Sequence, residues 1–337
     1  SPQAPPSGCR RSSSPDPSIF RSGSPPDYTR FNAMRFSVWP SPMRPWEEVL
    51  EVARHAEGTG WDGVYFADHF MPNDMTGDNP LDGPTLECWA VLAGLAAATE
   101  RVRLGSLVCG NTYRHPAVLA NLAAATDHVS RGRVVLGLGA GWQLNEHRAY
   151  GIDLFDTRTR LDRFEEACAV VRSLLDNERT TFDGKHYQLL EAPCQPAPVQ
   201  ARLPLLVGGG GEKRTLRIAA EHADEWNVWG DPALCEQKAG VLAQHCEAIG
   251  RDPATIVHST QAMVFLSEDE GWLSGKRGQD VGRPVIVGNP DEVTDVIGRY
   301  RDAGIDEVIV PEWNMGPMPR RKDTLELFIE RVAPAFR

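Results

Sequence analysis

The sequence lacks the residue spacings by which proteins usually hold a metal ion or a disulfide framework. It contains no Cys-x-x-Cys, His-x-His or His-Glu-x-x-His motif, which argues against the common zinc sites. The cysteines are scattered and odd in number, so we expect free thiols in a reducing cytoplasm and no metal site. They are Cys9, Cys88, Cys109, Cys168, Cys194, Cys235 and Cys246.

Long apolar runs and an excess of basic charge are also missing. No run approaches the roughly 20 residues of a membrane-spanning helix, so we expect no membrane association. The 337 residues carry a formal net charge of −11, which disfavours a nucleic-acid-binding surface. Hydrophobic residues make up 41% of the chain, enough for the large core of a globular protein.

Residues 1–33 differ in composition from the rest of the chain. They are dense in proline and serine and offer little apolar surface to bury, so we expect a disordered tail. Arg10 and Arg11 resemble a twin-arginine signal, but no apolar stretch follows them, and export is not expected. We assign residues 34–337 to one functional domain.

From Met34 onward, eight strand-like runs alternate with eight helical patterns. Several of these runs are almost entirely apolar, which is typical of parallel strands buried on both faces. We therefore predict a (β/α)8 barrel. An open, doubly wound sheet is the alternative, but its glycine-rich turn normally follows the first strand, and none is found there. The expected strands are residues 35–39, 63–69, 102–109, 133–139, 204–207, 225–229, 256–266 and 307–310.

Three connections are longer than ordinary loops and predict insertions after the second, fourth and seventh strands. They cover residues 70–83, 177–202 and 267–289. The middle one contains an Asp183-Gly184 turn between polar and apolar residues, which predicts a small hairpin.

Two glycine-rich turns follow predicted strands. Gly137, Gly139 and Gly141 leave little side-chain bulk, so either a flat ligand approaches the backbone or the chain simply turns tightly. Residues 206–215 (LVGGGGEKRT) run from a strand through glycines into a helix. Such a helix N-terminus presents free N–H groups to an anion, which favours a phosphate site over a flexible loop.

The other predicted strand ends carry aromatic, small and amide side chains. That composition suits a planar aromatic cofactor better than a metal ion, and barrels of this class place function at these ends. Asp68-His69 ends the second strand. His69 is either a proton donor and acceptor for a substrate or a solvated residue capping the strand. Cys109 ends the third strand, and we expect it to pack rather than act as a nucleophile.

Four segments together resemble the bacterial-luciferase-like superfamily, and within it the oxidoreductases that use coenzyme F420. They are residues 112–120 (TYRHPAVLA), 126–133 (TDHVSRGR), 137–146 (GLGAGWQLNE) and 223–227 (ADEWN). The resemblance covers about residues 34–337. It implies a barrel, usually a homodimer, with the deazaflavin at the C-terminal mouth.

The resemblance also implies roles for individual residues. The deazaflavin ring would lie against the end of the third strand, where a non-prolyl cis peptide is expected within residues 108–111. His69 would lie near the substrate as the catalytic residue, and Trp39, Trp142 and Trp229 would shape the substrate pocket. The expected cofactor-binding residues are Asp68, Cys109, Gly110, Asn111, Ala140, Gly141, Asn145, Gly209, Gly210, Gly211 and Thr215.

The chain departs from the family pattern at two positions. The sugar-phosphate dehydrogenases of this branch have a catalytic glutamate where this chain has Trp142, which disfavours that activity. The luciferase has an arginine for the flavin phosphate where this chain has Ala140, which favours F420 over FMN. We therefore expect an F420-dependent hydride-transferring oxidoreductase. The alternatives are a reduced-flavin (FMN) monooxygenase and a barrel that binds cofactor without catalysis.

Overall fold

The computed structural model describes residues 33–72, 82–279 and 281–337. The predicted tail therefore lies outside the described residues, except for Ala33. The backbone N–H of Met34 donates to the carbonyl of Phe336 at 2.8 Å, so the segment before the first strand meets the C-terminal end of the chain. None of the helices in the described ranges combines the length and apolar character needed to cross a bilayer.

Eight parallel strands form a closed barrel, which confirms the predicted fold over the open sheet. Each strand pairs with the next around the ring, and pairing of β3 with β5 closes it. A ninth short strand, β4, continues β3 along β5. The strands are β1 (Arg35–Trp39), β2 (Gly63–Phe66), β3 (Arg103–Ser106), β4 (Cys109–Gly110), β5 (Val134–Gly139), β8 (Leu205–Gly208), β9 (Glu225–Val228), β10 (Val257–Gln261) and β13 (Glu307–Pro311).

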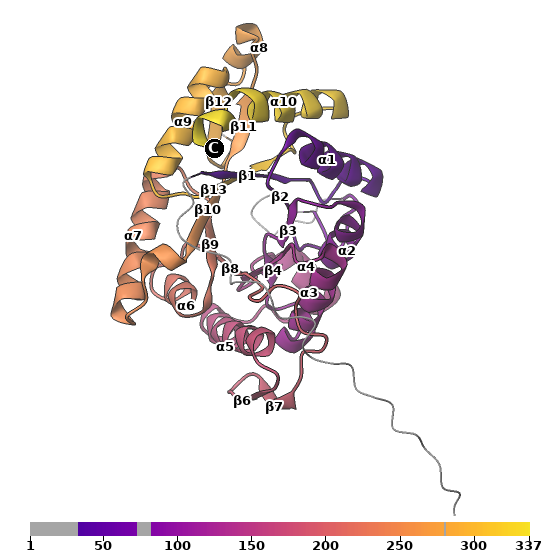
Figure 1. The fold of residues 1–337 in the computed structure, drawn as a ribbon, viewed down its shortest axis with the longest axis vertical. Coiled ribbons are helices and arrows are strands. Elements are labelled where there is room, and N and C mark those ends of the chain that lie inside the picture. The colour runs from indigo at the N-terminus through magenta and orange to yellow at the C-terminus, as the bar shows by residue number, and fades with distance from the viewer. Residues whose placement is uncertain (1–32, 73–81, 280) are drawn as a thin grey trace, which may run out of the picture.

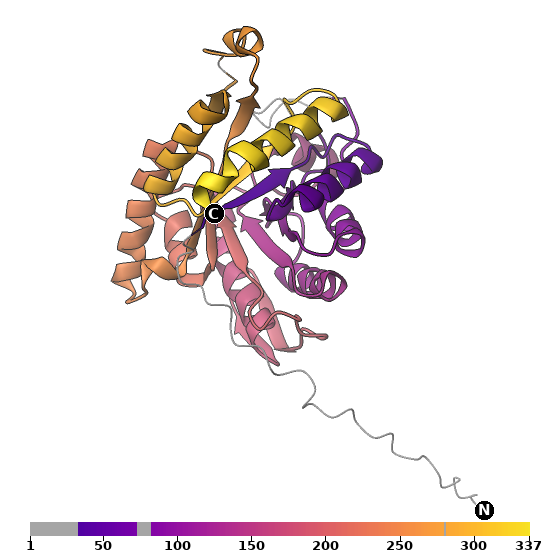
Figure 2. The same cartoon turned by 45° about the horizontal axis from the view of Figure 1, so that its top comes forward.

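Helices surround the strands, as Figures 1 and 2 show. Several begin at an acidic or amide side chain followed by proline, such as Asp231-Pro232 and Asn289-Pro290, where the missing proline N–H costs nothing. The ring consists of α1 (Trp46–Thr59), α2 (Cys88–Ala98), α3 (Pro116–Ser130), α5 (Thr157–Asp176), α6 (Thr215–His222), α7 (Pro232–Ala248), α9 (Pro290–Asp302) and α10 (Met318–Arg331). The short helices are α4 (Leu144–Tyr150), α8 (Glu270–Ser274), η2 (Pro253–Thr255) and η3 (Ala333–Phe336).

Two predicted strands are each divided in the structure. The third breaks between β3 and β4, at Leu107 and Val108. The seventh leaves the barrel after Gln261, and β11 (Met263–Leu266) pairs in parallel with β12 (Val285–Gly288) in a separate sheet. The apolar run continues through this exit because β11 packs close to α10 and β13, so the sequence does not mark the break.

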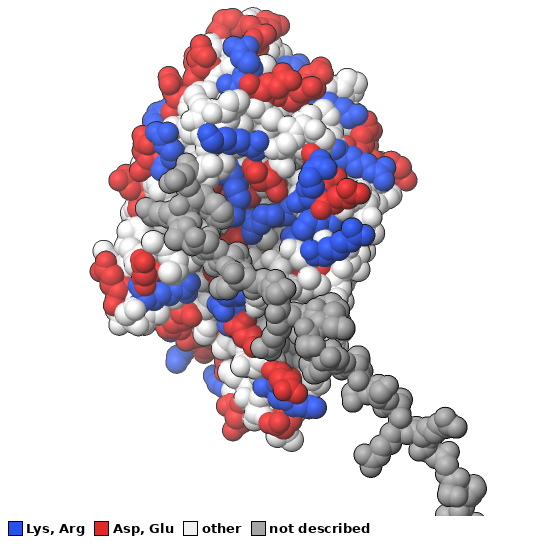
Figure 3. Space-filling view, in the orientation of Figure 1, with Lys and Arg blue, Asp and Glu red and all other residues white. Residues whose placement is uncertain are grey.

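Of the three predicted insertions, most of the first, at residues 70–83, lies outside the described residues. The predicted hairpin is present as β6 (Thr180–Asp183) and β7 (Gln188–Ala192), antiparallel to each other. It follows α5 rather than a strand directly, and it projects at one end of the molecule in Figure 1, while α8 projects at the other. Acidic and basic side chains are interspersed over the face shown in Figure 3.

A buried ionic network fills the end of the barrel where the strands begin. Glu307 pairs with Arg35 at 3.1 Å and with Arg103 at 3.3 Å, and it accepts from the hydroxyl groups of Ser37 and Tyr65. Burial opposes ionisation of Glu307, but the two arginines and the hydroxyl groups outweigh it and lower its pKa. The carboxylate therefore stabilises the fold in its ionised form.

Stability should depend on pH through Glu307. Because its pKa is lowered in the folded state, its contribution is present above the unfolded pKa of about 4.3 and is lost as pH falls through the folded value. In urea denaturation at pH 7, the free energy of unfolding of Glu307→Gln should be about 1–3 kcal/mol lower than that of the wild type. Between pH 7 and pH 3, the free energy of unfolding should fall less in Glu307→Gln than in the wild type. Exposed Glu330→Gln is the control. Parallel pH profiles for the wild type and Glu307→Gln would contradict the assignment.

Candidate active site

A cavity of about 510 Å³ opens at the ends of the barrel strands, where the sequence predicted the site. Most of the predicted site residues line it: Trp39, Asp68, His69, Cys109, Gly110, Ala140, Gly141, Trp142, Gly209, Thr215 and Trp229. Four predicted residues do not: Asn111, Asn145, Gly210 and Gly211. The structure therefore gathers one cluster from segments far apart in the sequence.

The floor of the cavity is formed by the break in the third strand. Leu107 and Val108 line the cavity and are joined by a non-prolyl cis peptide, one bond before the predicted segment. The side chain of Val108 occupies the space left by two glycines, because a Cβ atom at Gly139 or Gly208 would lie 2.8 Å from it. The glycines thus admit Val108 to the floor.

Gly137 has a structural role that the sequence did not reveal. A Cβ atom there would lie 2.0 Å from the backbone oxygen of Ser106, so only glycine lets the two strands approach. The hydroxyl of Ser106 accepts from the Gly137 N–H at 3.0 Å. The expectation that a ligand occupies the space beside Gly137 is therefore wrong, because the neighbouring strand fills it.

Asp68 is held rigidly beneath the cavity rim. Its carboxylate accepts two bonds from Arg114, at 2.7 and 3.0 Å, and one from the Gly110 N–H at 3.1 Å. Burial raises the pKa of Asp68, and the Arg114 pairing acts against this rise. Arg114 lies within the family-like segment 112–120, but no pattern in the sequence indicates that it pairs with Asp68. Asp68 thereby ties the end of β2 to β4.

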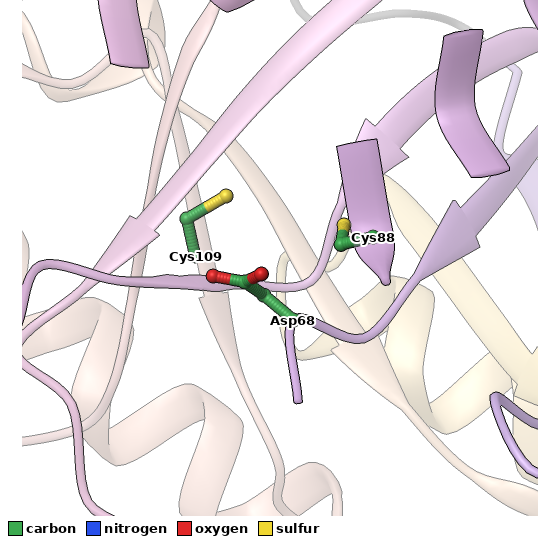
Figure 4. A group of neighbouring side chains, drawn as sticks. All are labelled: Asp68, Cys88 and Cys109. Carbon is green, nitrogen blue, oxygen red and sulfur yellow. The ribbon is translucent and has the colours of Figure 1, made fainter. Parts of the chain in front are cut away.

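Cys88 and Cys109 lie beside Asp68, as Figure 4 shows. One ligand atom from each of the three residues falls within 4.8 Å of the others, close enough for a metal ion. However, Arg114 already neutralises the carboxylate, and burial raises the pKa of the Cys88 thiol well above its usual range. A protonated thiol and a paired carboxylate are poor metal ligands, so this chemistry favours packing.

His69 is oriented by a buried carboxylate on α4. Its Nδ1 lies 2.8 Å from Oε1 of Glu146, which is fully buried. The other oxygen of Glu146 accepts from the backbone N–H groups of Phe70 and Met71 at 2.7 and 3.3 Å, and the hydroxyl of Tyr113 also donates to this carboxylate. The alternative of a solvated strand-capping histidine is thus not what the structure shows.

The charge state of Glu146 follows from these bonds. Burial opposes its ionisation, but His69, Tyr113 and the Phe70 N–H outweigh burial and lower the pKa of Glu146. Burial and the adjacent carboxylate also raise the pKa of Tyr113 well above its usual range. Near neutral pH, an ionised Glu146 therefore accepts from a protonated Tyr113 and from Nδ1 of His69.

Aromatic side chains form one wall of the cavity. Trp39 packs edge-on against Trp313, with ring centroids 4.7 Å apart, and lies 5.7 Å from Trp229. Trp142 lies at the rim, 45% exposed, with its ring perpendicular to that of His69 at 5.7 Å. Trp313 follows the eighth strand, and its part in this wall depends on a closed barrel, which brings β13 next to β1.

The turn after β8 leads to the N-terminus of α6, which has no side-chain cap. Gly209 and Thr215 line the cavity there. Gly210 and Gly211 lie behind them, where a Cβ atom would meet Val228 at 3.1 Å and Thr215 at 2.8 Å, respectively. The guanidinium of Arg214 at this helix start does not face the cavity, because it pairs with Asp162 at 2.6 Å and with Glu165 at 2.9 Å.

The two predicted amides are buried beside the site rather than in it. Asn111 donates from Nδ2 to the hydroxyl of Tyr187 at 3.3 Å, which ties the end of β4 to the hairpin. Asn145 donates to the carbonyl of Pro72 at 2.9 Å and accepts from the Glu146 N–H at 2.8 Å. Asn145 therefore supports the segment after His69 and the start of α4.

Comparison with known proteins places this chain in a family. The model of the luciferase-like monooxygenases matches residues 29–273. An F420-dependent glucose-6-phosphate dehydrogenase of Kineococcus radiotolerans is 32% identical over 78% of this chain and 86% of its own. An F420-dependent hydroxymycolic acid dehydrogenase of Mycobacterium tuberculosis is 29% identical over 81% of this chain and 73% of its own.

The fold has relatives among solved structures as well. The structure of an F420-dependent secondary alcohol dehydrogenase in complex with an F420–acetone adduct superposes with a TM-score of 0.77. It is 21% identical in sequence, and the match covers 90% of this chain and 99% of that one. At this identity the likeness concerns the fold, whereas the family model and the sequence relatives carry the assignment. The chain belongs to the luciferase-like monooxygenase family.

Proposed function

We propose that this protein is an F420-dependent oxidoreductase that transfers a hydride between the deazaflavin and a small organic substrate. The observation that carries the proposal is the pairing of His69, at the cavity wall, with the buried carboxylate of Glu146. Relatives named as F420-dependent dehydrogenases align with more than two thirds of the chain. When bound, coenzyme F420 supplies the ring carbon that accepts or donates the hydride.

His69 exchanges the proton that accompanies the hydride. Because Nδ1 is engaged by Glu146, Nε2 is the ring nitrogen left for the substrate. In the oxidising direction, neutral His69 takes the proton of a substrate hydroxyl on Nε2, and the ionised Glu146 stabilises the resulting imidazolium. In the reducing direction, the imidazolium donates that proton to the oxygen of the substrate carbonyl, which becomes a hydroxyl.

The described residues fit a deazaflavin with a phosphate-bearing tail. Leu107, Val108 and Ala140 supply apolar wall on which a flat ring would rest. Gly209 and Thr215, at the uncapped N-terminus of α6, would hold a phosphate through N–H groups and a hydroxyl. A Cβ atom at Gly209 would lie 3.2 Å from Thr215, so a side chain there would crowd this cradle.

The remaining predicted cofactor residues divide into two groups. We assign direct contact with the cofactor to those that line the cavity: Asp68, Cys109, Gly110, Ala140 and Gly141. We assign an indirect, supporting role to the four that lie behind its wall: Asn111, Asn145, Gly210 and Gly211. The supporting residues fix the strand ends and the start of α6, and thereby the positions of the groups that touch the cofactor.

The substrate pocket lies between His69 and the tryptophans. Trp39, Trp142 and Trp229 present apolar surface there, which suits a substrate with an aromatic or aliphatic body. Trp142 stands where the resemblance implies a catalytic glutamate in sugar-phosphate dehydrogenases. We therefore expect this protein to act on a different substrate from the glucose 6-phosphate of its named relatives.

Titration of the purified protein with F420 and with FMN, followed by fluorescence, tests the proposal. We expect F420 to bind at least about tenfold more tightly than FMN, because the chain lacks an arginine at Ala140 for the flavin phosphate. His69→Ala should bind F420 as the wild type does. Preference for FMN would instead favour the reduced-flavin monooxygenase, and failure to bind either would refute both.

A second copy of this chain is our proposed partner. Helix α2 is apolar on all sides and packs on α3. On α3, Val118 and Val129 are 55% and 49% exposed, respectively. Adjacent exposed alanines on both helices would let two copies approach closely. Light scattering should therefore give a dimer for the wild type and a monomer for Val118→Asp with Val129→Asp. Leu190→Asp, on the hairpin, should remain dimeric.

We also propose a cytoplasmic location. The six cysteines in the described part of the chain are unpaired and buried. Thiols persist in this form in a reducing compartment.

A further inference from the structure

Among the described residues that line the cavity, one arginine has no acidic partner. Arg283, in the segment between α8 and β12, is the only lysine or arginine among the described residues of the cavity lining. Its guanidinium carbon lies 4.6 Å from the ring centroid of Trp229. Burial lowers the pKa of Arg283, and no carboxylate acts against this. No hydrogen-bond or ion-pair partner of Arg283 occurs in the described part of the chain.

Three other partly buried arginines of the fold have acceptors within the protein. Arg114 is paired with Asp68, and Arg321 with Glu312 at 2.9 Å. Arg251 donates to the backbone carbonyls of Ala220 and Ala223 at 2.9 and 2.7 Å. Among the described residues, Arg283 has neither kind of acceptor. Its half-buried guanidinium lies at the cavity, so a ligand that enters the cavity can supply one.

The stacking on Trp229 leaves the donors of Arg283 available. A guanidinium that lies on an aromatic ring uses its face, while the five N–H groups around its edge remain free to bind a planar anion in a forked geometry. The only carboxylate among the described lining residues, Asp68, is already paired with Arg114. The cavity therefore presents one fixed positive charge next to an aromatic wall.

We propose that Arg283 binds the carboxylate of an aromatic or aliphatic carboxylic acid, whose body packs against Trp39 and Trp229. This assignment rests on the proposed oxidoreductase function and names its substrate class. A carboxylate carries one charge and two coplanar oxygens, which match one guanidinium edge. A phosphate dianion would call for further donors, and neither a lysine nor a second arginine lines the described cavity.

Calorimetric titration of the full chain with three probes tests the assignment. The probes are 2-naphthoate, its uncharged methyl ester and glucose 6-phosphate. We expect wild-type protein to bind 2-naphthoate about tenfold or more tightly than the ester, and glucose 6-phosphate more weakly than 2-naphthoate. Arg283→Gln should abolish the preference for the acid, whereas Arg283→Lys should keep part of it.

A matched control is Arg320→Gln, because Arg320 also stacks on a tryptophan, Trp272, at 3.8 Å, but lies outside the cavity lining. This variant should keep the preference of the wild type. Equal binding of acid and ester by the wild type, absence of 2-naphthoate binding, tighter glucose 6-phosphate binding, or an unchanged preference in Arg283→Gln would each overturn the assignment. The F420 titration is independent of these probes, so failure of the general function would be recognised separately.

Discussion

His69→Ala should lower kcat by roughly a hundredfold or more while leaving the affinity for F420 nearly unchanged. The reason is that the variant removes the Nε2 atom that exchanges the substrate proton, a contribution of about 10²–10⁴ in typical enzymes. The proposed phosphate site at Gly209 and Thr215 lies after β8 and at the start of α6, so the substitution leaves it in place. Steady-state kinetics measure the change in kcat, with a substrate found by screening alcohols with and without a carboxylate group. Titration with F420 measures the change in cofactor affinity.

His128→Ala provides the control for this substitution. His128 is an exposed residue of α3 that contacts the carbonyl of Ala197 at 2.8 Å, far from the cavity lining. Its replacement should leave kcat within about twofold of the wild type, as is usual for surface positions. Unchanged turnover in His69→Ala would remove His69 from the mechanism, and loss of F420 binding would show that it serves the cofactor instead.

Glu146→Gln should lower kcat by about tenfold or more with little change in KM. Glutamine keeps the size of the side chain but removes the negative charge that stabilises a protonated His69, and its amide can donate as well as accept. The carboxylate is fully buried and bonded to His69, so no solvent charge replaces it. Kinetics should therefore show the loss in turnover rather than in substrate binding.

The tautomer of His69 separates this positioning role from general damage to the fold. Nitrogen NMR should find the Nδ1–H tautomer in the wild type and a mixture of tautomers in Glu146→Gln. Glu166→Gln is a matched control, because Glu166 also accepts from backbone N–H groups, those of Lys185, His186 and Tyr187, but outside the cavity. If both variants lost turnover equally, or the tautomer of His69 stayed the same, Glu146 would be only structural.

The sequence predicted the fold well because the barrel repeats one local pattern. Buried parallel strands are apolar throughout, and their ends are marked by residues such as Asp68-His69 and Gly208–Gly211. The same signal failed at residues 256–266, where apolar character continues while the chain leaves the barrel for another sheet. Apolar patterning reports burial, and it does not say against which sheet a strand is buried.

The sequence predicted at which end of the barrel the cavity lies, but not which side chains contact one another around it. The C-terminal ends of the strands gather at one mouth of a barrel, so Trp39, His69 and Trp229 could be placed together from the sequence alone. The partners of His69 and Trp229 could not be placed in this way, because Glu146 lies on the short helix α4 and Arg283 lies in a loop. The same holds for Arg114, the partner of Asp68. Which side chains meet across the mouth depends on loop conformation. Asn111 and Asn145 are buried beside the cavity instead of lining it, which their position at strand and helix ends did not reveal.

A crystal structure of the complex with F420 tests the central claim most directly. The account predicts the deazaflavin ring in the cavity beside Val108, its phosphate at Gly209 and Thr215, and Nε2 of His69 facing the open side of the ring. A ring bound elsewhere on the barrel, or His69 turned away from Glu146 and from the ring, would contradict the proposed function.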